Sequence, residues 1–293
     1  MQLIDGKHVA SLIQAEIAQE VQNLKEKGQK IPHLAAVLVG NDAPSETYVN
    51  GKVKACHNVG FGSTLLRFPD TISETALLAE IEKLNQNPEI DGFIVQLPLP
   101  KHIDVVKITE AIDYRKDVDG FHPINVGRMA KNLPAYISAT PLGILKLLEY
   151  YQIPTVGRHC VVLGRSHIVG SPMSILMARN TPIGNSTVTL CHSKTQNLAE
   201  YTRQADILIA AIGIPQFVKA DMVKEGAIVI DVGINRIEDT KRKSGFRLVG
   251  DVDFEKVAPR CYAITPVPGG VGPMTITALM LNTLLAAQKK VYG

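Results

Sequence analysis

The stretch Arg158–Pro172, RHCVVLGRSHIVGSP, decides how this sequence is interpreted. Its first half, Cys160–Leu163, is a short run of mostly apolar residues that ends at a glycine, which is typical of a buried strand. Ser171 is a suitable helix cap, Pro172 suits a first helical turn, and the residues that follow favour a helix. A glycine turn between a strand and a helix amino terminus gathers backbone N–H groups that can bind a pyrophosphate.

The glycine spacing in this turn departs from the usual dinucleotide fingerprint. Ser166 stands where G-x-G-x-x-G has its second glycine, and Gly170 comes one position late. The turn alone is therefore compatible with two interpretations, a nucleotide site or a structural glycine at a tight contact between helix and strand.

The next expected strand, Ser186–Leu190, favours the nucleotide site and indicates which nucleotide binds there. NAD sites usually carry Asp or Glu roughly 20 residues after the turn, where the acid binds the ribose hydroxyls, whereas NADP sites carry groups that bind the 2′-phosphate. Here that place holds Ser193 and Lys194, and the turn itself adds Arg165. Because a hydroxyl and two cations suit a phosphate, the sequence predicts NADP as the cofactor.

Length and composition limit the class of protein. The 293 residues can form two domains, and 45% hydrophobic with 20% charged residues is typical of soluble proteins. A net charge of +3 is too small to indicate nucleic acid, and no apolar run approaches the ~20 residues of a membrane span. The start, MQLIDGKHVA, does not resemble a signal peptide, and the four cysteines and eight histidines show no metal-binding spacing. We therefore expect a cytoplasmic protein with buried, reduced cysteines and no metal site.

Strands and helices alternate along the chain, which predicts an α/β fold with parallel sheets. The final helix is long enough to pack back on the first domain, and the basic run Lys241–Lys243 is expected to be a solvated hairpin turn. The expected strands cover 34–39, 63–68, 92–97, 160–163, 186–190, 207–211, 227–231 and 263–265, and the expected helices cover 7–28, 45–59, 73–85, 105–112, 142–151, 171–178 and 275–291.

A proline-bearing stretch, 134–141, marks the expected junction between two domains. We expect residues 1–139 and the carboxy-terminal helix 275–293 to form an α/β catalytic domain. Residues 140–274 are expected to form a Rossmann-type nucleotide-binding domain, with a cleft between the two.

Three polar side chains in the first domain are candidates for chemistry. Tyr48 and Lys52 are four residues apart on an expected helix and therefore share a face, and a desolvated lysine can take part in acid–base catalysis. Gln96 ends an otherwise apolar strand, which is where such sheets hold their sites. A surface Tyr–Lys contact and a buried, hydrogen-bonded glutamine remain the alternatives.

Two turns or loops are also candidates. Asp117 and Asp119 precede Gly120; one carboxylate commonly caps a turn, but two are seldom needed. The segment Pro266–Thr275 combines prolines with three glycines, and glycine allows close backbone approach to a ligand. A plain linker is the alternative, although it would not need such a density of both residues.

With these residues in view, the sequence resembles the bifunctional methylenetetrahydrofolate dehydrogenase/methenyltetrahydrofolate cyclohydrolase family over essentially its full length. Its length fits the unit that carries these two activities without an appended formyltetrahydrofolate synthetase domain. The matching motifs are YVNGKVKAC (48–56), DGFIVQLPLP (91–100), KDVDGFHPINVGR (116–128), GRSHIVGSPM (164–173), CHSKT (191–195), GAIVIDVGIN (226–235), VGDV (249–252) and ITPVPGGVGPMT (264–275).

The resemblance implies roles for individual residues. Lys52 would be the key catalytic residue, Gln96 would support it, Tyr48 would line the folate cleft and Asp119 would bind the pterin end, whereas Lys54 would face elsewhere. Ala139 departs from the family, where many members carry Cys. The implied folate contacts are Tyr48, Lys52, Gln96, Leu97, Pro98, Asp119, Pro268, Gly269, Gly270, Val271, Gly272, Pro273, Met274, Thr275 and Ile276, and the implied NADP contacts are Gly164, Arg165, Ser166, Ser193 and Ile234.

The resemblance also implies an activity and a setting. The expected enzyme oxidises 5,10-methylenetetrahydrofolate with NADP and hydrolyses the methenyl product to 10-formyltetrahydrofolate, as a homodimer paired through the nucleotide-binding domain. That reaction belongs to one-carbon folate interconversion, which serves purine, histidine and methionine biosynthesis.

Two alternatives to this function remain. Short-chain-type dehydrogenases also carry Tyr-x-x-x-Lys, but their nucleotide fingerprint precedes that pair, whereas here the pair comes first. A non-enzymatic NADPH-binding module would leave Lys52, Gln96 and Asp119 without a purpose.

Overall fold

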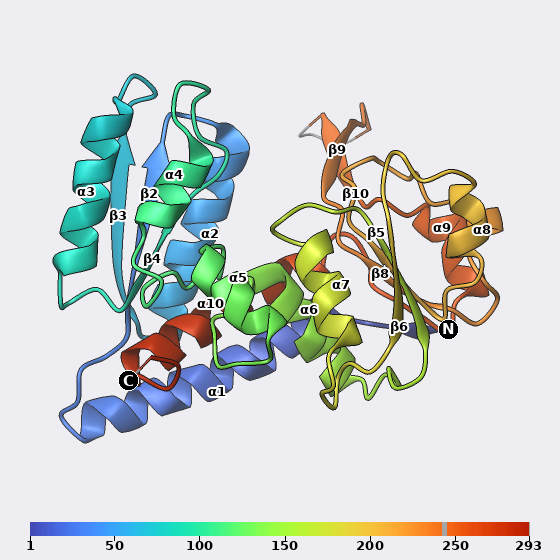
Figure 1. Cartoon of the computed structure of the whole chain (residues 1–293), viewed down its shortest axis with the longest axis horizontal. Coiled ribbons are helices and arrows are strands. Elements are labelled where there is room, and N and C mark those ends of the chain that lie inside the picture. The colour runs from blue at the N-terminus through green and yellow to red at the C-terminus, as the bar shows by residue number, and fades with distance from the viewer. Residues whose placement is uncertain (242–244, 293) are drawn as a thin grey trace. The chain divides into compact units, whose positions relative to one another are not determined.

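The computed structural model describes residues 1–241 and 245–292, and the chain divides into two compact units (Figure 1). Unit 1 comprises Met1–Ala10 and Thr140–Thr275, and unit 2 comprises Ser11–Ala139 with the carboxy-terminal segment from Ile276. Most of the expected hairpin turn at Lys241–Lys243 lies outside the described residues.

The division differs from the expected one at the amino terminus, where residues 1–139 were predicted to stay together. Strand β1 (Gln2–Leu3) pairs in parallel with β11 (Ala263–Ile264) in unit 1. The backbone N–H of Gln2 donates to the Tyr262 carbonyl at 2.7 Å, and the N–H of Ile4 donates to the Ile264 carbonyl at 2.8 Å. The first residues therefore complete the sheet of unit 1.

Unit 1 is built on a six-stranded parallel sheet with the order β1-β11-β8-β7-β5-β6. The residues of β5, β7 and β8 are almost all buried, which explains why these strands are continuous apolar runs in the sequence. The central strands of this sheet are β5 (His159–Leu163), β6 (Thr187–Cys191), β7 (Ile207–Ala210) and β8 (Ile228–Asp231). An antiparallel pair is formed by β9 (Asn235–Glu238) and β10 (Phe246–Val249). The α-helices in this part of the chain include α6 (Ala139–Tyr150), α7 (Gly170–Ala178), α8 (Leu198–Thr202) and α9 (Phe254–Val257).

The strand order of unit 1 contains a switch point. Strand β5 lies between β6 and β7, so the chain leaves β5 toward one side and later returns on the other. Open α/β sheets bind their ligands at such a point, outside the carboxyl ends of the strands. The turn that follows β5 is the one that the sequence singles out.

Unit 2 contains a three-stranded parallel sheet with the order β3-β2-β4 (Figure 1). Its strands are β2 (His33–Val39), β3 (Gly62–Phe68) and β4 (Gly92–Val95). Successive side chains of β2 point to opposite faces, and Leu34 through Val39 are all buried, so both faces of the sheet are covered.

The helices of unit 2 account for this burial. One core cluster joins Val37 and Phe93 of the sheet to α3 (Glu74–Gln86) and α4 (Val105–Ala111). Helix α2 (Ala43–Val59) begins where the Asp42 carboxylate accepts from the Ser45 N–H at 2.9 Å. Further helices of the chain are α1 (Gly6–Glu26), α5 (Pro123–Ala130) and α10 (Val271–Ala287).

Several helices differ from the sequence prediction. Helices α5, α8 and α9 were not expected, because their eight, five and four residues are too few to show a clear apolar period. Helix α10 begins at Val271, four residues before the expected start, so half of the predicted loop 266–275 is helical. The glycines and the proline there indicate a loop from sequence alone, although proline is well suited to a first helical turn. In α1, Leu12 was expected on the buried face but is 40% exposed.

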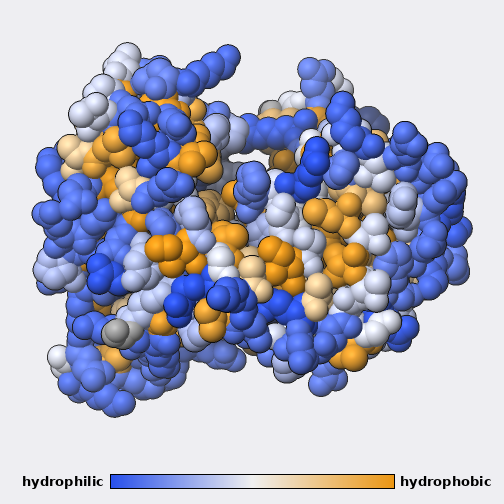
Figure 2. All heavy atoms as spheres, viewed as in Figure 1, coloured by the Kyte–Doolittle hydropathy of each residue, from blue (hydrophilic) through white to orange (hydrophobic). Residues whose placement is uncertain are grey.

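Hydrophilic residues cover most of the face shown in Figure 2. All four cysteines are free thiols buried in the protein. Within residues 1–241 and 245–292, no helix is both long and apolar enough to cross a membrane.

Candidate active site and nucleotide site

Lys52 is a buried lysine on α2 with a defined partner. Only 9% of the residue is exposed, and its Nζ donates to Gln96 Oε1 at 3.0 Å. Gln96 follows β4, and its backbone N–H continues the pairing with β2 by donating to the Val37 carbonyl at 2.9 Å. Its own amide nitrogen donates to the Leu97 carbonyl at 2.7 Å, which turns the amide oxygen toward Lys52. The predicted proximity of Lys52 and Gln96 is therefore observed.

Burial also changes the proton affinity of this lysine. Burial lowers the pKa of Lys52, and the nearby charge of Asp119 acts in the opposite direction. Burial likewise raises the pKa of Asp119, while Lys52 opposes that shift. Both shifts favour neutral forms because charges lose hydration inside a protein. Lys52 can therefore exchange a proton at a lower pH than an exposed lysine can.

The other side chains of α2 that were considered in the sequence are more exposed than Lys52. Tyr48, one turn before Lys52, is 40% exposed, and Lys54 is exposed as well. Beyond Lys52, the helix packs on α10, where the Cys56 thiol lies 3.7 Å from the Met280 sulfur. Of the two lysines, only Lys52 is buried.

Asp117 and Asp119 stand in one turn but differ in their surroundings. Asp117 is 1% exposed and accepts from the His122 N–H at 2.8 Å and from Asn125 Nδ2 at 2.9 Å. Gly120, at a φ of 72°, leaves no room for a side chain because a Cβ there would press on the backbone of residues 136–138. Asp117 is thus the carboxylate that shapes the turn, which leaves Asp119 as the candidate for contact with substrate.

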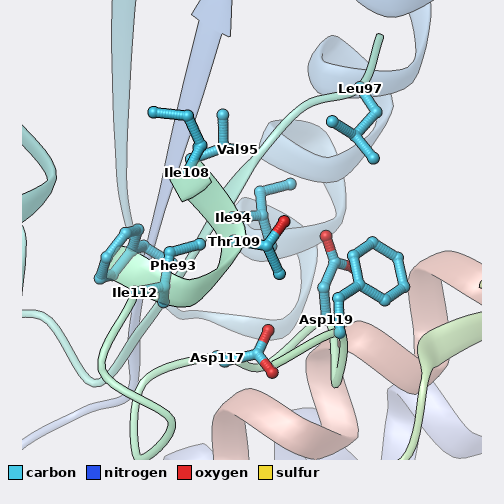
Figure 3. A pocket seen from close by; sticks show the side chains of 10 residues that line it. Phe93, Ile94, Val95, Leu97, Ile108, Thr109, Ile112, Asp117 and Asp119 are labelled. Atoms are coloured by element: carbon cyan, nitrogen blue, oxygen red, sulfur yellow. The ribbon is translucent and has the colours of Figure 1, made fainter. Parts of the chain in front are cut away.

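A small pocket lies beside this turn (Figure 3). The carboxylates of Asp117 and Asp119 and the Thr109 side chain reach it among apolar residues of β4 and α4. Its volume is about 10 Å³, which is room for about one water and far too little for a folate. Burial raises the pKa of Asp117 to about 7, although its hydrogen bonds oppose the shift.

The turn after β5 requires its two glycines for steric reasons. Gly164 has a φ of 114°, and a Cβ there would overlap the Ala211 carbonyl in the turn after β7. A Cβ at Gly170 would overlap the Gly164 carbonyl. Both interpretations of this turn are therefore compatible with the structure, since glycines that allow tight packing also bring the backbone of the turn close to a ligand.

The cap of α7 differs from the predicted one. Ser171 is already the second residue of the helix, and its hydroxyl donates to the Arg165 carbonyl at 3.1 Å. Ser166 performs the expected task instead, because its Oγ accepts from the N–H groups of Val169 at 3.2 Å and Gly170 at 3.4 Å. The helix begins earlier than the proline suggests, so the capping hydroxyl comes from the preceding turn.

The predicted phosphate-binding residues lie at the ends of neighbouring strands. Arg165 follows β5, while Ser193 and Lys194 follow its neighbour β6, and all three are exposed. The β6 turn is fixed by the His192 N–H, which donates to Thr195 Oγ1 at 2.9 Å. An exposed hydroxyl and two cations at one edge of a parallel sheet, beside a helix amino terminus, fit a dinucleotide with an extra phosphate.

The remaining predicted contacts are spread over several segments. Ile234 follows β8 and is 43% exposed. Leu97 and Pro98 follow Gln96 directly, with a cis peptide bond between them. Pro268 is exposed, Gly269 has a φ of 108°, and Val271–Thr275 form the first turn of α10, which continues into Ile276.

Sequence reasoning missed two acids that organise the loops of unit 1. Asp251 accepts from the N–H groups of Ile212 at 2.7 Å and Gly213 at 3.0 Å, and from Asn235 Nδ2 at 3.0 Å. Asp231 accepts from the N–H groups of Gly233, Asp251 and Val252 at 2.9–3.0 Å. These carboxylates fix the segments that follow β7 and β8. Asp231 could have been found by the signal that identified Gln96, a polar residue at the end of a buried strand.

Comparisons with known proteins agree with this geometry. Residues 4–119 match the catalytic domain of tetrahydrofolate dehydrogenase/cyclohydrolase, and residues 138–291 match its NAD(P)-binding domain. The bifunctional protein FolD of Cytophaga hutchinsonii is 64% identical over 99% of this chain and 100% of its own. The FolD crystal structure from Campylobacter jejuni is 46% identical with a TM-score of 0.93 over 99% of both chains.

A further solved structure is that of methylenetetrahydrofolate dehydrogenase-cyclohydrolase (FolD) from Trypanosoma brucei, complexed with NADP cofactor and inhibitor. It is 38% identical to this chain, with a TM-score of 0.93 over 99% of this chain and 98% of its own. Two family models in the expected order, relatives above 60% identity and a shared fold lead to one conclusion. The chain belongs to the tetrahydrofolate dehydrogenase/cyclohydrolase family.

Proposed function

We propose that this protein oxidises 5,10-methylenetetrahydrofolate to 5,10-methenyltetrahydrofolate with NADP, and then hydrolyses the product to 10-formyltetrahydrofolate. The observation that carries the proposal is the buried Lys52 amine, held by Gln96 and lying near Asp119. Family membership supports both activities, and the NADP complex of the Trypanosoma brucei relative supports the cofactor.

The residues of unit 1 suit NADP, which when bound accepts the hydride. Gly164 and the amino terminus of α7 would receive the pyrophosphate, with Ser166 holding the turn in shape. Arg165, Ser193 and Lys194 would bind the 2′-phosphate, since guanidinium and ammonium groups form strong charge-assisted hydrogen bonds with phosphate.

Dehydrogenation mainly requires that the folate is held in the correct position for hydride transfer. Removal of a hydride from the methylene bridge leaves a cation that the two flanking nitrogens stabilise, so no acid or base is required. Asp119 would hold the pterin end, Tyr48 and the backbone from Pro268 to Ile276 would line the folate, and the glycines there would permit close approach.

Hydrolysis of the methenyl cation needs a proton acceptor. Water attacks the methenyl carbon and loses a proton, which a neutral Lys52 amine would take. The bond from that carbon to N5 then breaks, the hydroxyl gives up its proton and N5 takes one up, which leaves the formyl group on N10. Burial lowers the pKa of Lys52, which makes the neutral amine available at a lower pH. Gln96 Oε1, 3.0 Å from Nζ, would keep the amine in place during the transfer.

The wider setting follows from the family. The reaction would place the protein in one-carbon folate interconversion, which serves purine, histidine and methionine biosynthesis, and we infer a cytoplasmic homodimer paired through the nucleotide-binding domain. The short-chain-type alternative does not share this order of domains, and a purely regulatory module would not require a buried lysine with two polar neighbours.

Replacement of Arg165 tests the cofactor. Arg165→Ala should lower kcat/KM for NADP by about 10- to 100-fold and kcat/KM for NAD by less than about threefold. The reason is that a charge-assisted hydrogen bond to the 2′-phosphate is worth about 1.5–3 kcal/mol. The measurement is kcat/KM for each cofactor with methylenetetrahydrofolate. Arg158→Ala is the matched control, since that exposed arginine precedes β5 instead of following it. Equal efficiency with both cofactors in the unmutated protein would refute the preference.

Replacement of Lys52 tests the hydrolysis. Lys52→Met keeps the length of the side chain and removes the amine, so methenyltetrahydrofolate hydrolysis above the spontaneous rate should fall by ~100- to 10,000-fold. Lys54→Met, on the exposed side of the same helix, should leave the rate unchanged. In the unmutated protein the rate should rise with pH as Lys52 loses its proton, with a midpoint below 10.5.

The same variant separates the two sites. NADP affinity, measured by titration, should survive in Lys52→Met because the nucleotide residues belong to unit 1. Dehydrogenation can fall as well, since the amine also helps to position the folate. Near-normal hydrolysis by Lys52→Met would show that the lysine has no catalytic part.

Light scattering tests the inferred dimer. At micromolar concentration the mass should be about twice the 31.8 kDa of one chain. A mass equal to that of a single chain would exclude the homodimer without affecting the proposed reaction.

A further inference from the structure

The carboxy-terminal segment of unit 2 contacts the Asp117–Gly120 turn directly. Asn282 of α10 is 1% exposed, and its Nδ2 donates to the carbonyls of Val118 at 2.8 Å and Ile137 at 2.9 Å. Val118 stands between the two aspartates of the turn. One side-chain amide therefore fixes the peptide next to Asp119 and joins it to the segment 136–138, against which Gly120 packs.

A second contact comes from the end of the chain. The Tyr292 hydroxyl donates to Asn125 Oδ1 at 2.6 Å. Asn125 is fully buried, and its Nδ2 donates to Asp117 Oδ2 and to the Tyr114 carbonyl, both at 2.9 Å. Tyr292 thus acts on Asp117 through Asn125, because its hydroxyl helps to keep the amide oxygen away from that carboxylate.

Aromatic packing holds Tyr292 in place. Its ring meets the rings of Tyr114 and Tyr136 edge to face, with centroids 4.9 and 5.5 Å apart. The Arg128 guanidinium lies 5.2 Å from the centroid of the Tyr292 ring. Two ring contacts, one cation contact and one hydrogen bond together fix the position of Tyr292.

These contacts are more specific than burial requires. Helix α10 is otherwise rich in apolar residues, so a leucine at position 282 would fill space without an unsatisfied amide. The amide is useful only because two backbone carbonyls face it. Both Asn282 and Tyr292 act on the same turn, from different parts of the segment, and that turn carries the candidate folate-binding carboxylate.

We infer that Asn282 and Tyr292 are positioning residues, which hold the Asp117–Gly120 turn so that Asp119 can bind the folate. The inference rests on the proposed function and adds a specific task for the carboxy-terminal segment. Each residue acts through another group: Tyr292 acts through Asn125, and Asn282 acts through the Val118 peptide.

The test is a comparison of Michaelis constants in Tyr292→Phe. This variant keeps the ring and removes only the hydroxyl, so the protein should fold. The KM for methylenetetrahydrofolate should rise by about 3- to 10-fold, because the turn loses the support of one hydrogen bond, that from Tyr292 to Asn125. The KM for NADP should stay within about twofold. Tyr262→Phe, an exposed tyrosine of unit 1, is the matched control and should change neither constant.

The split between the two constants separates positioning from simple destabilisation. A protein that is merely less stable loses active molecules, which lowers the apparent kcat and leaves both KM values as they were. An unchanged folate KM in a folded Tyr292→Phe protein would overturn the inference. If that protein does not fold, the same two Michaelis constants are measured in Asn282→Ser, which leaves Tyr292 in place. An unchanged folate KM in that variant would likewise overturn the inference.

The unmutated protein separates this inference from the proposed function. If it does not reduce NADP with methylenetetrahydrofolate, the proposed function fails and the inference fails with it. If it does so normally and the variants keep a normal folate KM, only the positioning role is wrong.

Discussion

The burial of a lysine amine is the constraint on which unit 2 depends. A charged ammonium that leaves water loses several kcal/mol of hydration, so it must find polar partners or give up its proton. Lys52 has polar partners, because its Nζ donates to Gln96 Oε1 and the Asp119 carboxylate lies near. It also gives up its proton more readily, because burial lowers its pKa. These groups come from three different elements, so the site exists only when α2, β4 and the Asp117–Gly120 turn are all in place.

Each of these elements is fixed by a local device. The Asp42 carboxylate caps α2, and the β2 backbone receives Gln96 at the end of β4. The turn is shaped internally by Asp117 and externally by the carboxy-terminal segment. In unit 1 the carboxylates of Asp231 and Asp251 have the same role. They accept hydrogen bonds from backbone N–H groups and so hold together the segments after β7 and β8. Buried acids that accept backbone N–H groups thus organise the loops around both sites.

Much of this arrangement could be predicted from the sequence, because its strands are buried on both faces. Such strands are continuous apolar runs, and the polar residue that ends one of them, Gln96, is conspicuous. The helical spacing of Tyr48 and Lys52 also sufficed to place them on one helix. The approach of Lys52 to Gln96 was predicted for these two reasons, and the structure shows it.

The rest depends on contacts between residues far apart in the chain. Strand β1 has two residues and no pattern of its own, so only its pairing with β11 reveals it. Helix α5 is too short to show a period, and the glycines at the start of α10 are indistinguishable in sequence from those of a loop. The roles of Ser166, Asp251 and Tyr292 arise from where their hydrogen-bond partners lie in space.

The central claim is that the Lys52 amine loses its proton more readily than an exposed lysine does. The most direct measurement is an NMR titration of ¹³C-labelled lysine side chains, with the Lys52 signal assigned by its absence from a Lys52→Met protein. The account predicts that Lys52 titrates at a pH clearly below the 10.5 that is usual for lysine. Titration of Lys52 together with the exposed lysines would contradict it.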